Sequence, residues 1–180
     1  MTWTLRPARL EDIPQLEPLI ARSARELSAS DYTPEQIEGA LRGAFGVDTQ
    51  LIRDQTYFVV EADGKIVGCG GWSKRKTLFG GDARAERDAA ELNPQTEAAK
   101  IRAFFIDPDY TRRGIGKAIL DRCEAEARAR GFKRYELVAT LPGMRLYAAQ
   151  GYIPGDAIEY PLSGGATITF VPMSKVPVSS

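Results

Sequence analysis

Apolar residues recur at helical spacing near the start of the chain. A helix with one buried face is predicted by five of them: Ile13, Leu16, Ile20, Ala24 and Leu27. Pro18 lies inside this pattern and predicts a kink or a late helix start. A second helix is predicted from Thr33, because Thr33-Pro34-Glu35-Gln36 combines a capping threonine, proline at the first helical position and glutamine three residues after the cap. Its buried stripe would be Ile37, Leu41 and Phe45.

Shorter apolar runs predict strands. Residues 2–6 alternate weakly and indicate a first strand. Residues 56–62 and 65–72 are apolar and flank Asp63-Gly64. Such a pair between two strands predicts a hairpin, because both central positions of the tight turn need positive φ.

The second half of the chain alternates between the two patterns. It predicts a strand over 100–106, a helix from Gly114-Ile115-Gly116 to Gly131, a strand over 135–140, a short helix over 142–150 and a closing hairpin of 157–162 with 166–172. The order β-α-α-β-β-β-α-β-α-β-β predicts an α/β (α+β) fold around one mostly antiparallel sheet. We expect a single domain over 1–175 and a short tail over 176–180.

Residues 73–99 break the pattern. They are charged, contain Gly80-Gly81 and Asn93-Pro94, and show no long apolar stripe. Long irregular segments inside compact domains are commonly functional or disordered. The one regular element that these residues suggest is a short helix over 83–92.

Composition excludes several kinds of chemistry. The chain has no histidine, which excludes a Ser-His-Asp triad, a Cys-His dyad and a histidine-based zinc site, and we expect no metal. Lys+Arg and Asp+Glu both count 24, so no net charge attracts the chain to nucleic acid or membrane. The run Lys74-Arg75-Lys76 is too short to indicate nucleic-acid binding, and we expect a solvated loop.

Other features indicate an ordinary cytoplasmic protein. Cys69 and Cys123 stand in apolar segments and are expected to be small buried core residues. The first residues lack the pattern of a signal peptide, and no apolar run approaches the roughly 20 residues that span a bilayer.

Candidate chemistry concentrates where the 100–106 strand leads into the next helix. The first turn of a helix offers free N–H groups and a partial positive charge, and glycines allow a phosphate to approach the backbone. Arg112, Arg113 and Lys117 add charge, so a phosphorylated ligand is predicted at this turn. A tight turn with solvated arginines is the plain alternative.

Two better-known phosphate motifs do not fit this segment. A dinucleotide fingerprint needs glycine at position 119, where Ile119 stands. A Walker-type loop fails at Thr111 and at Ala118.

The segment from Phe104 to Lys117 resembles the coenzyme A-binding signature of the GNAT superfamily of N-acetyltransferases. The resemblance extends to residues 5–8 with 11–13, to the Asp63-Gly64 hairpin and to residues 146–152. It implies a GNAT-type acyl-CoA N-acyltransferase fold, with helices on both faces of a mixed, mostly antiparallel sheet. It also implies transfer of an acetyl group from acetyl-CoA to a primary amine of a small molecule or peptide, by direct attack in a ternary complex.

The resemblance assigns roles to individual residues. The pantetheine arm would pair with the backbone of Phe105 and Ile106, in a gap where this strand splays from the 135–140 strand. Tyr147 would protonate the departing thiolate. The pyrophosphate would be held by the backbone of Arg112, Arg113, Gly114, Ile115, Gly116 and Lys117. Apart from the resemblance, the chemistry of the reaction calls for an N–H donor at the oxyanion, and a backbone N–H of the splayed strand, such as that of Ile106, could supply it.

One position departs from the family's pattern. The signature prefers glutamine or arginine three residues before the first glycine, where this chain has Thr111. We expect binding to survive, with Arg112 or Arg113 supplying the charge.

The general base is not indicated by the sequence. Residues 100–102 are basic where some relatives carry a carboxylate, and Glu61 and Glu97 are the nearest acids. Proton loss through water and an amine that is already neutral are equally compatible.

The sequence also does not identify the amine acceptor or the partners of the protein. Residues 73–99 and the turn between the first two helices are expected to shape the acceptor pocket, and the closing hairpin could pair with a second copy as a homodimer. A non-catalytic acyl-CoA sensor and an interaction domain without nucleotide are the competing functions.

Overall fold

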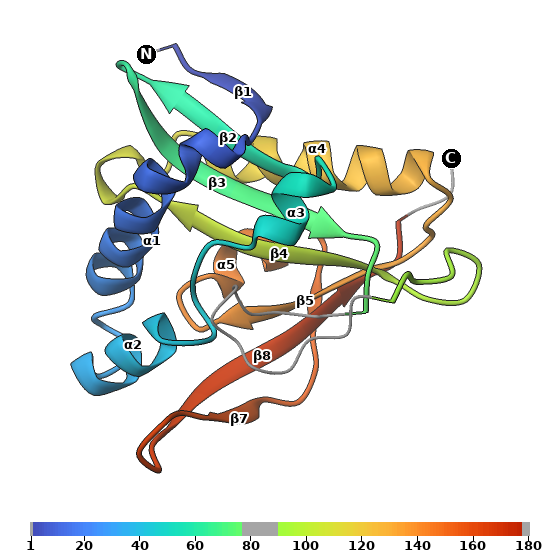
Figure 1. Cartoon of the computed structure of the whole chain (residues 1–180). Helices are drawn as coiled ribbons and strands as arrows, with labels where there is room; N and C mark the ends of the chain where they lie inside the picture. The colour runs from blue at the N-terminus through green and yellow to red at the C-terminus, as the bar shows by residue number, and fades with distance from the viewer. Residues whose placement is uncertain (1, 77–89, 178–180) are drawn as a thin grey trace.

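The computed structural model describes residues 2–76 and 90–177, which fold around one eight-stranded sheet (Figure 1). The strands are β1 (Thr4–Pro7), β2 (Tyr57–Ala62), β3 (Lys65–Ser73), β4 (Ala99–Ile106), β5 (Tyr135–Thr140), β6 (Ile153–Pro154), β7 (Ile158–Pro161) and β8 (Thr167–Lys175). Their order is β1-β2-β3-β4-β5-β8-β6, with β7 also paired to β8. Within the described ranges every pairing is antiparallel except that of β4 with β5.

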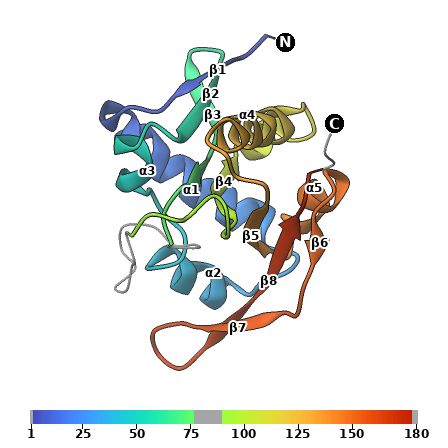
Figure 2. The ribbon, with the colours of Figure 1, turned by 90° about the vertical axis from the view of Figure 1, so that its right-hand side faces the viewer.

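Helices cover both faces of the sheet (Figure 2). They are α1 (Ile13–Leu27), α2 (Pro34–Leu41), α3 (Thr49–Arg53), α4 (Ile115–Ala129) and α5 (Met144–Ala149). Alternate residues of β2 explain why both faces are covered: Phe58 and Val60 pack on the side of α4, whereas Tyr57 and Val59 pack on the side of α1. The predicted α/β fold with a mostly antiparallel sheet is confirmed.

Two local predictions are confirmed in their geometry. Asp63 and Gly64 have φ of 54° and 76°, as the tight hairpin turn requires. At the start of α2, the N–H of Gln36 donates to the Thr33 hydroxyl at 3.1 Å, and the N–H of Thr33 donates to the Gln36 side chain at 2.9 Å. This is the reciprocal cap that the sequence indicated.

Other predictions need correction. The expected late start of the first helix is wrong, because α1 begins at Ile13 and contains Pro18. α2 ends at Leu41, so Phe45 lies beyond it rather than on its stripe. Neither α3 nor β6 was predicted, because elements of five and two residues are too short to show periodicity.

The two ends of the 73–99 segment pair with each other. The N–H of Lys76 donates to the Ala90 carbonyl at 3.0 Å, and Arg75 forms a bridge with Glu91. Residues 83–89 of the suggested helix lie outside the described residues, and its end is wrong because Glu91 is strand-like. Arg75 also binds Asp54 at 2.8 Å, so the basic run is tied to the body of the protein instead of being a solvated loop.

Both cysteines lie in the core as free thiols, which confirms the prediction. Burial raises the pKa of the Cys69 thiol to about 12, so it stays protonated at neutral pH. In the part of the chain that the structure describes, no helix is both long and apolar enough to cross a bilayer.

A buried ion pair supports β4 from the side of α3. The Arg102 guanidinium lies 2.7 Å from the Asp48 carboxylate, and the two side chains are 1% and 0% exposed. Asp48 also caps α3 by accepting from the N–H of Gln50 at 3.1 Å. The pair therefore joins a short helix to the strand that borders the candidate site.

Asp48→Ala is expected to lower the free energy of unfolding by about 3–5 kcal/mol, because it leaves the Arg102 charge buried without this carboxylate. Urea unfolding measures the change. Glu38→Ala, which breaks the exposed pair with Arg25 (2.7 Å), serves as the control and should lose much less. Equal losses for the two variants would contradict a supporting role for the buried pair.

Candidate active site

The site forms where the sheet opens between β4 and β5. These parallel strands pair only at their beginnings, Ala99 with Tyr135 and Lys100 with Glu136. Beyond Lys100 they separate, and residues of both strands line a cavity of about 430 Å³. The predicted splay of the two strands is confirmed.

A bulge in β4 shapes the edge of this opening. Cys69 pairs with Phe105 and Gly71 with Arg102, so Gly70 alone lies opposite two residues of β4. One of these, Ala103, has a φ of 57°, and its carbonyl accepts a hydrogen bond from the Tyr57 hydroxyl at 2.8 Å. The hydroxyl of a buried tyrosine therefore holds the bulge in place.

The glycine opposite the bulge makes room for an aromatic ring. A Cβ at Gly70 would lie 2.6 Å from Cδ1 of Phe104, so only glycine allows this ring to lie against β3. Phe104 in turn meets Tyr147 edge to face, with ring centroids 5.9 Å apart. The bulge was not predicted from the sequence, although the Gly70-Gly71 pair inside a predicted strand was an available signal.

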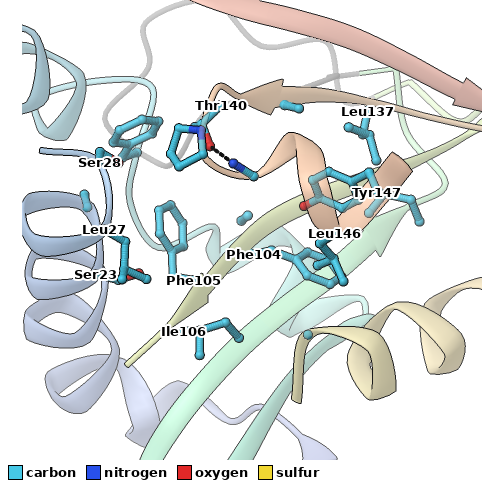
Figure 3. A pocket seen from close by; sticks show the side chains of 18 of the residues that line it. Ser23, Leu27, Ser28, Phe104, Phe105, Ile106, Leu137, Thr140, Leu146 and Tyr147 are labelled. Atoms are coloured by element: carbon cyan, nitrogen blue, oxygen red, sulfur yellow. Dashed lines mark hydrogen bonds between the residues drawn. The ribbon is translucent and has the colours of Figure 1, made fainter. Parts of the chain in front are cut away.

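Tyr147 is carried by α5 and lines the cavity, into which its hydroxyl oxygen points (Figure 3). Its ring is held between Phe104 and Tyr152, each with a centroid distance of 5.9 Å. Within residues 2–76 and 90–177 no hydrogen bond to the hydroxyl is seen. Burial raises the pKa of Tyr147 above its ordinary value, so the hydroxyl remains a proton donor at neutral pH.

The start of α4 forms the other end of the cavity. Gly114 has a φ of 78° and is followed directly by the first helical residue, so successive N–H groups converge on one point. Such a concave group of N–H donors at a helix N-terminus favours an anion. Gly116 has a second role, because a Cβ there would come within 3.0 Å of Leu146 on α5. Glycine thus lets α4 and α5 pack closely.

The structure brings together most of the residues predicted to bind a cofactor. Six of them line the cavity: Phe105, Ile106, Arg112, Gly114, Gly116 and Lys117. Two do not. The Arg113 guanidinium lies over the Tyr110 ring at 5.1 Å, and the Ile115 side chain is buried in the core. Only the backbone of these two residues remains as a candidate for anion binding.

The predicted acids lie elsewhere. Glu61 accepts hydrogen bonds from Arg6 at 2.9 and 2.6 Å, and Glu97 accepts from the N–H of Asn93 at 2.9 Å. Neither lines the cavity, and none of the described residues that line it is acidic. Lys100 at the start of the opening pairs with Glu136, and burial lowers its pKa. The structure therefore brings no carboxylate from the described residues to the position of a general base.

Most of the cavity wall that lies opposite Tyr147 was not predicted from the sequence. It is built from the end of α1, the segment between α2 and α3, and β8: Ser23, Ala24, Leu27, Ser28, Ala44, Phe45 and Phe170. The turn between the first two helices, which the sequence nominated, contributes Ser28 at its border. Helical spacing cannot separate residues that face a cavity from residues that face the core, so no sequence signal indicated the rest of this wall.

Known proteins share the sequence pattern and the fold of this chain. The sequence profile of the acetyltransferase (GNAT) family matches residues 21–152. The chain belongs to this family. An amino-acid acetyltransferase of Azotobacter vinelandii (strain DJ / ATCC BAA-1303) is 26% identical over 122 residues, which cover 67% of this chain and 23% of that protein. This GNAT chain therefore matches less than a quarter of that relative's length.

Solved structures show the same fold. A GCN5-related N-acetyltransferase from Rhodopseudomonas palustris superposes with a TM-score of 0.71 at 20% identity, covering 98% of this chain and 97% of that one. The PaiA N-acetyltransferase from Thermoplasma acidophilum, solved in complex with coenzyme A, has a TM-score of 0.66 at 17% identity, covering 98% and 100%. At these identities the likeness establishes the GNAT fold.

Gly114→Ala is expected to lower the free energy of unfolding by about 1–2 kcal/mol, because the left-handed conformation at φ 78° is costly for a residue with a Cβ. A steric clash is not the cause, since no atom lies within 4 Å of the added Cβ. Gly43→Ala is the matched control: it too meets nothing within 4 Å but lacks the strained φ. Thermal unfolding of both variants measures the difference, and equal stability would contradict the strained start of α4.

Proposed function

We propose that this GNAT chain transfers the acetyl group of acetyl-CoA to a primary amine of a small molecule or peptide. One observation carries the proposal: a single cavity runs from the N–H groups at the start of α4, along the open edge of β4, to the hydroxyl of Tyr147. Phosphate, pantetheine and thioester of one coenzyme would occupy these three places in that order.

The proposed coenzyme contacts follow from charge and from unpaired backbone. The pyrophosphate would be held by the N–H groups of Gly114 to Gly116, with Arg112 and Lys117 beside it. Lys117 also lies 2.7 Å from Asp121, which reduces its contribution. The two amides of pantetheine would lie along β4 at Phe105 and Ile106, where β5 has separated, and would pair with the backbone groups there that point away from β3. The PaiA N-acetyltransferase, which shares this fold, was solved in complex with coenzyme A, and this supports coenzyme A as the ligand.

Acetyl transfer would then be a direct displacement. The neutral amine attacks the thioester carbonyl, a C–N bond forms and the C–S bond breaks. The N–H of Ile106 on the open strand would stabilise the oxyanion, and Tyr147 would give its proton to the departing sulfur. The attacking nitrogen loses its proton to water, since the described cavity lining offers no carboxylate.

Tyr147→Phe is expected to lower kcat by roughly 10²-fold, because it removes the acid for the thiolate. The Kd of acetyl-CoA should change little, since the phenyl ring still packs against Phe104 and Tyr152. Thiol release measures kcat and calorimetry measures Kd. Because burial raises the pKa of Tyr147 above 10, ionisation of this group should cause no loss of kcat between pH 7 and pH 10.

Tyr160→Phe is the matched control, since Tyr160 belongs to β7 and is not among the residues lining the cavity. It loses the same hydroxyl and should keep the turnover of the parent protein. Unchanged turnover in Tyr147→Phe would remove the acid role from this residue.

Arg112 and Arg113 offer a second test with neighbouring, chemically identical residues. Arg112→Ala should weaken acetyl-CoA binding about fivefold, a moderate loss because the side chain is exposed. Arg113→Ala should have a smaller effect, because that guanidinium lies over Tyr110 and donates to the Asp109 carbonyl at 3.3 Å. Calorimetry measures both Kd values, and a larger loss in Arg113→Ala would overturn the proposed orientation of the loop.

A further inference from the structure

The wall of the cavity opposite Tyr147 is aromatic. Phe45 lies 5.8 Å from Phe105 and 6.0 Å from Phe170, measured between ring centroids. The three rings come from the segment after α2, from β4 and from β8, and all line the cavity. Rings that meet at such distances present edges and faces to which another ring can pack.

The end of α1 completes this wall. Ser23, Leu27 and Ser28 face the cavity from the side opposite α5 (Figure 3). Within residues 2–76 and 90–177 neither serine hydroxyl has a hydrogen bond to the protein, so both can contact a bound molecule. Thr140 differs from these serines, because its hydroxyl already accepts a hydrogen bond from the N–H of Gly143 at 3.2 Å.

The described residues offer no free carboxylate in the cavity lining for a second positive charge on the acceptor. The cations that line the cavity, Arg112 and Lys117, belong to the end at α4. Of the buried carboxylates, Asp48 is bound to Arg102 and Asp107 to Arg22, and the exposed Glu159 on β7 accepts from Thr167 at 3.0 Å. Burying an ammonium without an ion-pair partner is costly, so a polyamine or aminoglycoside would lose hydration without a free carboxylate among the described lining residues to replace it.

We infer that the amine acceptor of this chain is a small primary amine with an apolar, ring-bearing body and no second positive charge. The inference rests on the proposed acetyl transfer and names the substrate class of the same site. The ring packs against Phe45, Phe105 and Phe170, and the amino group points toward the thioester beside Tyr147.

A panel of amines tests this inference. With acetyl-CoA present, kcat/KM for 2-phenylethylamine should exceed that for spermidine and for kanamycin at least about tenfold. Equal or higher kcat/KM with either polycation overturns the inference. Calorimetry with acetyl-CoA alone separates failure of the proposed function from failure of the inferred acceptor class. Absence of acetyl-CoA binding contradicts the proposed function itself. If acetyl-CoA binds but the polycations are the better acceptors, only the inferred acceptor class is contradicted.

A charge added at the wall gives a second, independent measurement. Leu27→Glu places a carboxylate beside the rings, and Leu27 is 37% exposed, so the variant should fold. The ratio of kcat/KM for 2-phenylethylamine over spermidine should fall about tenfold, with the Kd of acetyl-CoA unchanged. Leu10→Glu is the matched control, because Leu10 is 47% exposed and lies on another part of the surface. An unchanged ratio in Leu27→Glu overturns the inference.

Discussion

The opening between β4 and β5 governs how the rest of the molecule is arranged. Two strands that separate inside a sheet leave N–H and C=O groups without their ladder partners, and such groups need another partner when they are shielded from water. The bulge at Ala103, held by the Tyr57 hydroxyl, and the Asp48–Arg102 pair stabilise β4 in this position. The gap is therefore built into the fold, and an extended ligand carrying amides is the natural occupant.

The parallel pairing of β4 and β5 explains where the charges lie. A parallel pair needs a crossover, which α4 provides, so the chain leaves the carboxyl end of β4 and enters α4 beside it. The strands pair at their beginnings and diverge toward their carboxyl ends, so the N-terminus of α4 lies at the open end of the gap. The two helical layers border different parts of the cavity: α4 and α5 border the proposed coenzyme end, and α1 borders the proposed acceptor end.

Local patterns were the predictable part of this molecule. The hairpin at Asp63-Gly64, the cap at Thr33 and the strand-turn-helix around Gly114 each depend on a few adjacent residues, and each was predicted. The bulge, the Asp48–Arg102 pair and the ring cluster of Phe45, Phe105 and Phe170 join residues far apart in the sequence. Arg112 and Arg113 look alike in sequence, and only the structure shows that Arg112 lines the cavity whereas the Arg113 guanidinium lies over the Tyr110 ring.

A crystal structure of the protein with coenzyme A would show whether the gap is the coenzyme site. The proposed mechanism predicts the pyrophosphate at the start of α4, pantetheine amides hydrogen-bonded to β4 between the separated strands, and the sulfur within about 3.5 Å of the Tyr147 hydroxyl. A coenzyme bound outside the gap, or a sulfur remote from Tyr147, would contradict it.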